Sequence, residues 1–97
     1  MVQLTRCNLE PQSITVDVDP TIFEDLWVRY KQSGRVVVEK KMEEITIDGF
    51  TLDYALLPEE TARFNTRDPV WIQITGMRGK DLPEYSTVIE ADVRDVV

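Results

Sequence analysis

Apolar and polar residues alternate along most of this chain. In the segment 13–18 the apolar positions are Ile14, Val16 and Val18, and polar residues separate them. The same alternation continues in the segments 26–31, 50–56 and 70–75. Because successive side chains of a strand point to opposite faces, this period predicts strands with one buried face. We therefore expect Ile14, Val16 and Val18 in a hydrophobic core.

Turn-forming residues between the alternating segments predict two hairpins. The tripeptide 32–34, Gln-Ser-Gly, joins the segment 26–31 to 35–40, which is rich in the β-branched residues that suit a strand. Asp48-Gly49 lies between two further alternating segments, and this dipeptide favours a two-residue turn in which both positions have positive φ. Both places are therefore expected to reverse the chain between antiparallel strands.

The segment 57–64 breaks the period of two. It begins Leu-Pro-Glu-Glu, and proline and acidic residues suit the first turn of a helix. We predict one short helical turn here that crosses between two sheets. A polar, glycine-bearing loop is expected at 76–81, and a returning strand at 85–93.

Short strands every eight to twelve residues, with one helical turn, are typical of an all-β domain. We predict an immunoglobulin-like antiparallel sandwich of about seven strands, with a closed barrel as the alternative. The chain has 97 residues, which suits one hydrophobic core without disulfides or metals. Residues 1–97 are therefore expected to form a single domain.

The net charge of the chain limits the classes of partner that it is expected to bind. Eighteen acidic and eleven basic residues give a formal charge of −7. A negative protein repels phosphate backbones and anionic lipid surfaces, so we expect no direct nucleic-acid or membrane binding. The start of the chain lacks the pattern of a secretory signal, and no apolar run is long enough to span a bilayer. Protein partners remain the expected class.

Catalytic chemistry has few candidate residues here. There is no histidine, which removes the commonest general base and a frequent metal ligand. Cys7 is the only cysteine, so it cannot form an internal disulfide, and we expect a small buried thiol. No glycine spacing matches a phosphate-binding loop. We expect a protein that is not an enzyme and uses no cofactor, metal or small-molecule substrate.

Two tryptophans pose the main question about binding. Alternation separates Trp27 from Leu26 and Val28, so Trp27 is either exposed or part of a strand buried on both faces. Trp71 poses the same question, and core or rim packing is the favoured interpretation for it. An exposed indole would instead be a docking anchor. The candidate partner-binding residues are Trp27, Trp71, Tyr30, Glu43, Glu44 and Asp48.

Several motifs follow one another in a distinctive order. They are Gln32-Ser33-Gly34 after the strand at 26–31, a strand ending in Glu39-Lys40, the turn Leu57-Pro58-Glu59-Glu60-Thr61, and the segment Val70-Trp71-Ile72-Gln73-Ile74. This order resembles a family of short immunoglobulin-like virion or tail-module proteins of tailed phages and prophages of Gram-positive bacteria. The resemblance covers roughly residues 10–97. Pro58 stands where that family has threonine, and residues 8–11 and 82–85 depart from its pattern.

The resemblance implies a non-catalytic structural or interaction protein of a phage tail or baseplate. Such a protein would act through protein–protein contacts, self-association within a particle included, and would be found in the virion or the host cytoplasm. The acidic charge supports an alternative, an anti-CRISPR-like nucleic-acid mimic that inhibits a host defence nuclease. The carboxylates that would imitate phosphates in such a mimic are Glu39, Glu43, Glu44, Asp48 and Asp53, and Lys40 and Lys41 interrupt them. A carbohydrate- or receptor-binding sandwich is a third hypothesis.

Overall fold

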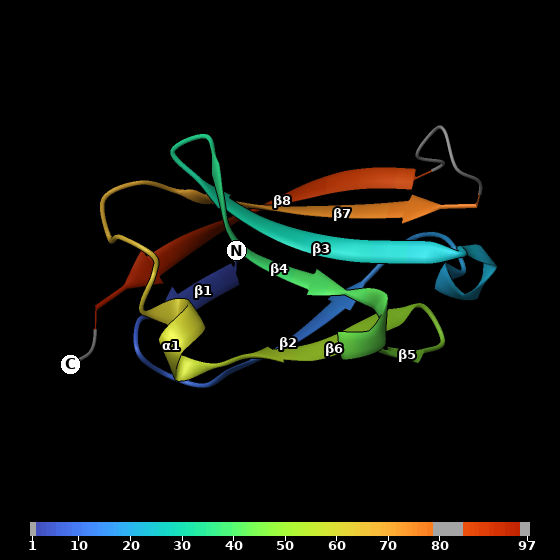
Figure 1. Cartoon of the computed structure of the whole chain (residues 1–97), viewed down its shortest axis with the longest axis horizontal. Coiled ribbons are helices and arrows are strands. Elements are labelled where there is room, and N and C mark those ends of the chain that lie inside the picture. The colour runs from blue at the N-terminus through green and yellow to red at the C-terminus, as the bar shows by residue number, and fades with distance from the viewer. Residues whose placement is uncertain (1, 79–84, 96–97) are drawn as a thin grey trace.

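Two β-sheets pack face to face in the computed structural model, which describes residues 2–78 and 85–95 (Figure 1). The strands are β1 (Val2–Thr5), β2 (Glu10–Thr15), β3 (Asp25–Gln32), β4 (Arg35–Lys41), β5 (Thr46–Asp48), β6 (Thr51–Leu56), β7 (Val70–Met77) and β8 (Tyr85–Arg94). The first sheet has the order β1-β8-β7-β3-β4, and the second has the order β2-β6-β5. The other elements are a helical turn, α1 (Pro58–Thr61), and the 3₁₀ turns Pro20–Ile22 and Met42–Glu44.

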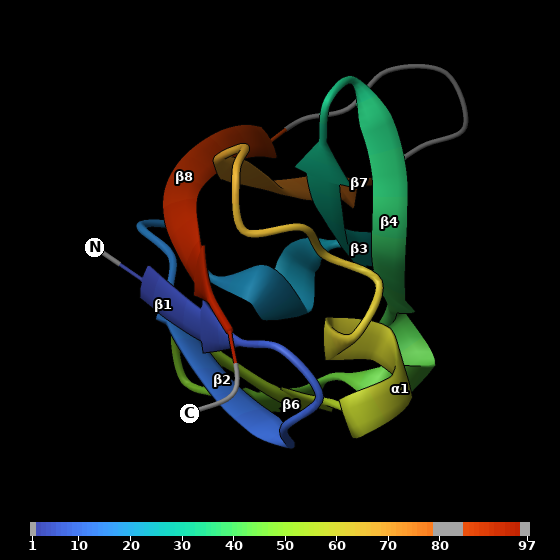
Figure 2. The ribbon, with the colours of Figure 1, turned by 90° about the vertical axis from the view of Figure 1, so that its left-hand side faces the viewer.

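The expected all-β sandwich with a short helical turn is confirmed. The described residues form eight strands, where the sequence predicted about seven. The difference includes β1, which pairs in parallel with β8, whereas the other strand pairs are antiparallel. A four-residue strand is too short for a period of two to stand out. Figure 2 shows β1 beside β8 at the edge of the five-stranded sheet.

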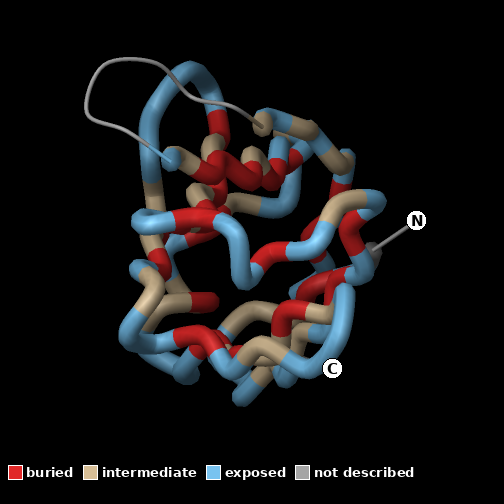
Figure 3. Tube along the Cα trace, turned by 90° about the vertical axis from the view of Figure 1, so that its right-hand side faces the viewer, coloured by how far each residue is buried: buried red, intermediate tan, exposed pale blue. Residues whose placement is uncertain are grey.

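Inward-facing side chains of both sheets form one hydrophobic core. The five-stranded sheet contributes Val28, Ile72 and Ile74, and the three-stranded sheet contributes Leu52 and Leu56, all fully buried. Each such side chain stabilises the fold by about 1.5–3 kcal/mol. Buried positions lie toward the middle of the molecule and exposed ones follow its outside (Figure 3). The three predicted core residues of the first alternating segment also pack here: Ile14 and Val16 are buried, and Val18 is partly buried.

The two predicted hairpins are present, and the second turns one residue later than expected. Between β3 and β4, Ser33 and Gly34 have φ of 54° and 76°, which matches a two-residue type I′ turn. Between β5 and β6, Asp48 pairs with Thr51, so the turn residues are Gly49 and Phe50. Gly49 has φ 60° and is the first turn residue, as a type II′ turn requires. Asp48 thus ends the strand and is not part of the turn.

Gly76 was expected in a polar loop, and that prediction is wrong. It lies inside β7, where it is buried and pairs with Leu26 of β3. A Cβ atom at this position would lie 2.5 Å from the ring of Phe23, which is itself buried. Gly76 is therefore needed for the close approach of this ring to the sheet. Residues 79–81 of the predicted loop lie outside the described residues.

Replacing Gly76 with alanine should destabilise the protein by about 1–3 kcal/mol, because the added methyl group overpacks the contact with Phe23. Urea unfolding followed by circular dichroism measures this change. The double variant Gly76→Ala/Phe23→Leu is the control, because a smaller, more adaptable side chain makes room for the methyl group. Its loss of stability should be smaller than the sum of the two single losses. Equal values would show that the two positions do not clash.

Candidate functional site

The outer face of the five-stranded sheet carries both tryptophans. In the pairing of β3, β7 and β8, Lys31 lies opposite Trp71, and Trp71 lies opposite Glu90. Directly paired residues of neighbouring antiparallel strands point to the same face. These three side chains therefore form a row across the sheet, which we call the Trp71 row. Inner-face neighbours such as Ile72 and Ala91 are fully buried, as the alternation requires.

Trp71 is an exposed aromatic residue. Its exposed fraction is 44%, so the favoured interpretation of core or rim packing is wrong. On the same face, Val88 of β8 is 54% exposed and Val36, which pairs with Lys31, is 50% exposed. Large apolar side chains exposed together on one face mark interaction surfaces more often than single exposed ones do. Tryptophan is also among the residues that contribute most to binding energy at protein interfaces.

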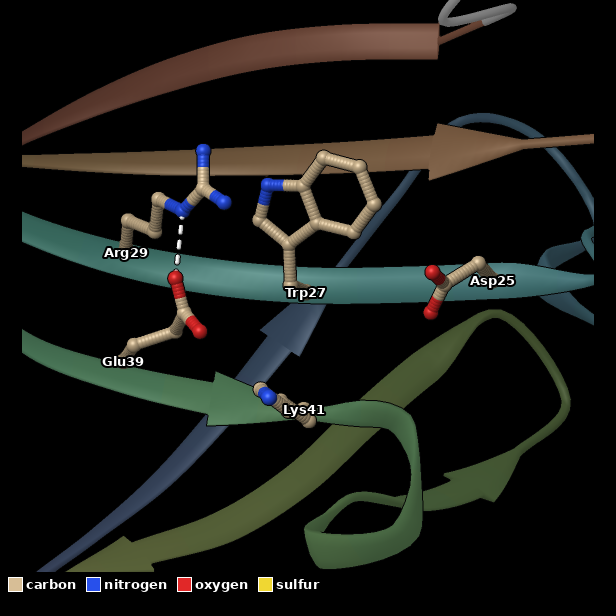
Figure 4. Close-up of a pocket in the computed structure, with 5 residues that line it drawn as sticks. All are labelled: Asp25, Trp27, Arg29, Glu39 and Lys41. Atoms are coloured by element: carbon tan, nitrogen blue, oxygen red, sulfur yellow. Dashed lines mark hydrogen bonds and ion pairs between the residues drawn. The ribbon is translucent and has the colours of Figure 1, made fainter. Parts of the chain in front are cut away.

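Trp27 is half-buried and lies in a shallow hollow of about 260 Å³ on the same face. Figure 4 shows the indole beside Arg29, with Glu39 and Lys41 projecting from β4. The Arg29 guanidinium lies 4.9 Å from the centre of the indole ring, and its Nε donates to the Glu39 carboxylate at 2.6 Å. Such stacking of a cation on an aromatic face is attractive by about 0.5–1 kcal/mol at exposed sites. Trp27 is therefore held by its neighbours, whereas Trp71 is open to a partner.

Lys31 and Glu90 are the charged ends of the Trp71 row. Neither has an ion-pair partner among the residues that the structure describes. The Trp71 ring separates them, so they cannot neutralise each other within one domain without crossing it. Alternation in the segment 26–31 also places Lys31 on the face of Trp27, because the two residues are four positions apart. It had not placed Glu90, because Val88, Ile89 and Ala91 are all apolar and obscure the period around it.

Tyr30 does not belong to this surface. It is fully buried, and its hydroxyl lies 2.6 Å from the hydroxyl of Tyr54 and donates to Gln12 Oε1 at 3.1 Å. Its prediction as a partner-binding residue is wrong for the folded domain. Its position in the alternation had indicated the inner face, where the hydroxyl groups of two tyrosines from opposite sheets satisfy each other. Cys7, expected to be buried, is exposed.

The acidic candidates do not form one surface. Glu39 lies on the outer face of the five-stranded sheet, where it pairs with Arg29. Asp48 and Asp53 come from β5 and β6 of the other sheet. Glu43 and Glu44 form the 3₁₀ turn between the sheets, and Glu44 lies 3.7 Å from the buried ammonium group of Lys40. This distribution gives a nucleic-acid mimic no continuous row of carboxylates, and that alternative stays a prediction.

The structure gives little basis for other classes of site. Within residues 2–78 and 85–95, no three of the side chains that commonly bind metals come together. No helix in the same ranges is long and apolar enough to cross a membrane. The expectations that the protein is not an enzyme and uses no cofactor remain predictions. The exposed apolar side chains of the Trp71 row and its neighbours make the outer face of the five-stranded sheet the candidate site.

Comparison with known proteins identifies the fold. No protein-family model and no curated protein matches this chain. Two crystal structures of strand-swapped dimers of the mouse leukocyte-associated immunoglobulin-like receptor 1 are similar to it. The immunoglobulin-like domain has a TM-score of 0.53 at 13% identity, and the extracellular domain has 0.51 at 12%, each over 96% of this chain and 86% of that chain. This chain has an immunoglobulin-like fold.

The low identity limits the likeness to the arrangement of strands. In that fold, antibody domains join the two sheets through a disulfide and bury a tryptophan of the third strand against it. This chain has one cysteine, which is exposed, and its third-strand tryptophan, Trp27, lies on the outer face. The core is held together by aliphatic side chains, the buried rings of Phe23 and Phe64, and the hydrogen-bonded tyrosine pair. The outer face therefore carries aromatic side chains that this core does not use.

Proposed function

We propose that this chain is a non-catalytic structural protein of a tailed-phage particle that docks to other proteins through the outer face of its five-stranded sheet. The observation that carries the docking role is the exposed Trp71, flanked by Val88 and by unpaired charges of both signs. The tail or baseplate location rests on the resemblance of the motifs between residues 10 and 97. The immunoglobulin-like fold supports the proposal, because each sheet of a two-layer sandwich has an outer face that other proteins can contact.

Two features of the outer face support a docking role. The described hollow near Trp27 is shallow, and two of its charged residues, Arg29 and Glu39, already bind each other. An exposed indole surrounded by aliphatic side chains and rim charges has the composition of an interface centre and rim. Trp71 and Val88 would supply apolar burial, and Lys31 and Glu90 would select the partner and its orientation.

Particles assembled with a Trp71→Ala variant should contain at least about tenfold less of this chain, because removing an interface hot spot costs 2 kcal/mol or more. The measurement is quantitative mass spectrometry of particles purified from the strain that carries the gene, with the native gene replaced by the variant. Phe50→Ala is the matched control, because Phe50 is 52% exposed in the β5–β6 turn of the other sheet. Absence of the unmodified chain from purified particles would contradict the phage role. Equal incorporation of both variants would contradict the docking face.

A further inference from the structure

The Trp71 row carries opposite charges on the two sides of its aromatic residue. Lys31 on β3 and Glu90 on β8 lie on opposite sides of Trp71, each one strand away. Neighbouring strands are about 4.8 Å apart, so the backbone positions of Lys31 and Glu90 lie at similar distances from that of Trp71. A basic position, an aromatic position and an acidic position thus occur in order across the sheet, with the aromatic residue at the centre.

We propose that a second copy of this chain occupies this face, in a two-fold dimer that pairs Lys31 of each copy with Glu90 of the other. This inference rests on the proposed docking role of the face. When two sheets pack face to face, the two-fold axis lies between them. An axis that runs along β7 over Trp71 exchanges the two sides of the row. Each Lys31 then lies over the partner copy's Glu90, and the two Trp71 rings meet at the axis.

The charges select this axis over its alternative. An axis that runs across the strands would place Lys31 over the second Lys31 and Glu90 over the second Glu90, and directly opposed like charges are destabilising. The row of side chains two residues further along β7 favours the same axis. Gln73 lies between Arg29 and Val88, so the axis along β7 brings two neutral amides together and places Arg29 over an aliphatic side chain. No like charges are opposed in either row.

A second copy also fits better than a partner of one sign. A purely acidic segment would pair with Lys31 and oppose Glu90, and a purely basic segment would do the reverse. The required partner has both charges in the opposite order around an apolar centre, and a rotated copy of this face has that arrangement. Two-fold homodimers are the commonest soluble oligomers, and their interfaces are self-complementary in this sense.

The size of the face indicates the class of small, weak interfaces. An eight-residue strand is about 26 Å long, and five strands span about 19 Å from the first to the last, so the face covers roughly 500 Å². This lies below the roughly 800 Å² per partner of a standard stable interface. We therefore expect a reversible dimer with a dissociation constant in the micromolar range, on the order of 10–100 μM. Many copies held side by side in a particle would assemble at such an affinity.

Charge reversal tests the proposed pairing. Lys31→Glu and Glu90→Lys each place two like-charged pairs across the two-fold axis, and each should weaken the homodimer at least about tenfold. An equimolar mixture of the two variants should form a heterodimer of nearly native affinity, because both contacts across the axis again join opposite charges. Sedimentation equilibrium from 5 to about 500 μM, a range chosen to bracket the expected constant, measures all three samples. Thermal unfolding of each variant checks that the fold is retained.

Asp48→Lys and Arg67→Glu are the matched controls. They make the same changes of charge at exposed residues outside β3, β7 and β8, and they should leave the dimer unchanged. A native chain that stays monomeric over the whole range would overturn the proposal. A dimer that neither reversal weakens, or a mixture that stays monomeric, would overturn it as well. If one of these results occurs while incorporation into particles still depends on Trp71, the proposed function holds and the partner at this face is a different protein.

Discussion

Raising the pH from 9 to 12 should unfold this protein near the upper end of that range, and replacing Tyr30 and Tyr54 with phenylalanine should remove most of the effect. The two tyrosines lie in the core, with their hydroxyl groups 2.6 Å apart. Burial raises the pKa of both above the ordinary value of 10, and the neighbouring Tyr54 raises the pKa of Tyr30 further. A phenolate at either position would be a buried charge without a cationic partner among the described residues.

The sign of the pH dependence follows from these pKa values. The folded protein holds both phenolic protons above pH 10, whereas the unfolded chain releases them, so unfolding releases protons and stability falls as pH rises. Each tyrosine contributes a slope of about 1.4 kcal/mol per pH unit between its unfolded and folded pKa. Two tyrosines over two pH units therefore lower the free energy of unfolding by about 5 kcal/mol. This is comparable with the whole stability of a small domain.

The measurement is urea unfolding at pH 8 and at half-unit steps from pH 9 to 12. The Tyr30→Phe/Tyr54→Phe variant is the comparison, because it keeps the rings and removes both protons. Tyr85, which is partly exposed and also has a pKa raised by burial, remains in both proteins as a common background. Parallel pH profiles of the two proteins would show that the buried pair does not control alkaline unfolding.

The sequence predicted the strands of this domain better than their contacts. Alternation identified the buried face of β3 and β7, and turn residues located both hairpins, because a period of two and a positive φ are local properties of the chain. The Asp48-Gly49 turn was misplaced by one residue because a single glycine suits either turn position, and only the pairing of Asp48 with Thr51 decides between them. The parallel pairing of β1 with β8 depends on residues about 90 positions apart. No local signal carries it.

The candidate site could also be predicted only in part, because alternation is a local property and the pairing of distant strands is not. Alternation assigned both tryptophans to the face opposite the aliphatic residues, yet it could not decide whether another layer covers that face. The described residues form two layers, so no third layer covers the outer side of the five-stranded sheet, where Trp71 is exposed. The Trp71 row requires the register of three strands. It could be recognised only after β3, β7 and β8 were aligned.

Gln32→Leu should destabilise the protein by about 3 kcal/mol, although leucine is larger in apolar area and similar in shape. The Gln32 side chain is 3% exposed and binds the loop that precedes β7. Its Nε2 donates to the carbonyl oxygens of Asn65 and Asp68 at 2.8 Å each, and its Oε1 accepts from the Asn65 N–H at 2.9 Å. Leucine leaves these three backbone groups without the partner, and each unsatisfied buried group costs about 1–3 kcal/mol. Loop rearrangement toward water recovers part of that sum.

The corresponding fall in melting temperature is about 12–24 °C, measured by differential scanning calorimetry. Gln73→Leu is the matched control, because Gln73 is a partly exposed glutamine of the same sheet whose amide has one long hydrogen bond, 3.5 Å, to Ser86. It should change stability by less than about 0.5 kcal/mol. Gln32→Glu separates hydrogen bonding from packing. Glutamate keeps the bond from Asn65 but points a carboxylate oxygen at two carbonyl groups, so it should be at least as destabilising as leucine at pH 7. A glutamate variant of native stability would mean that Gln32 only fills space, and that the loop before Trp71 is positioned by other contacts.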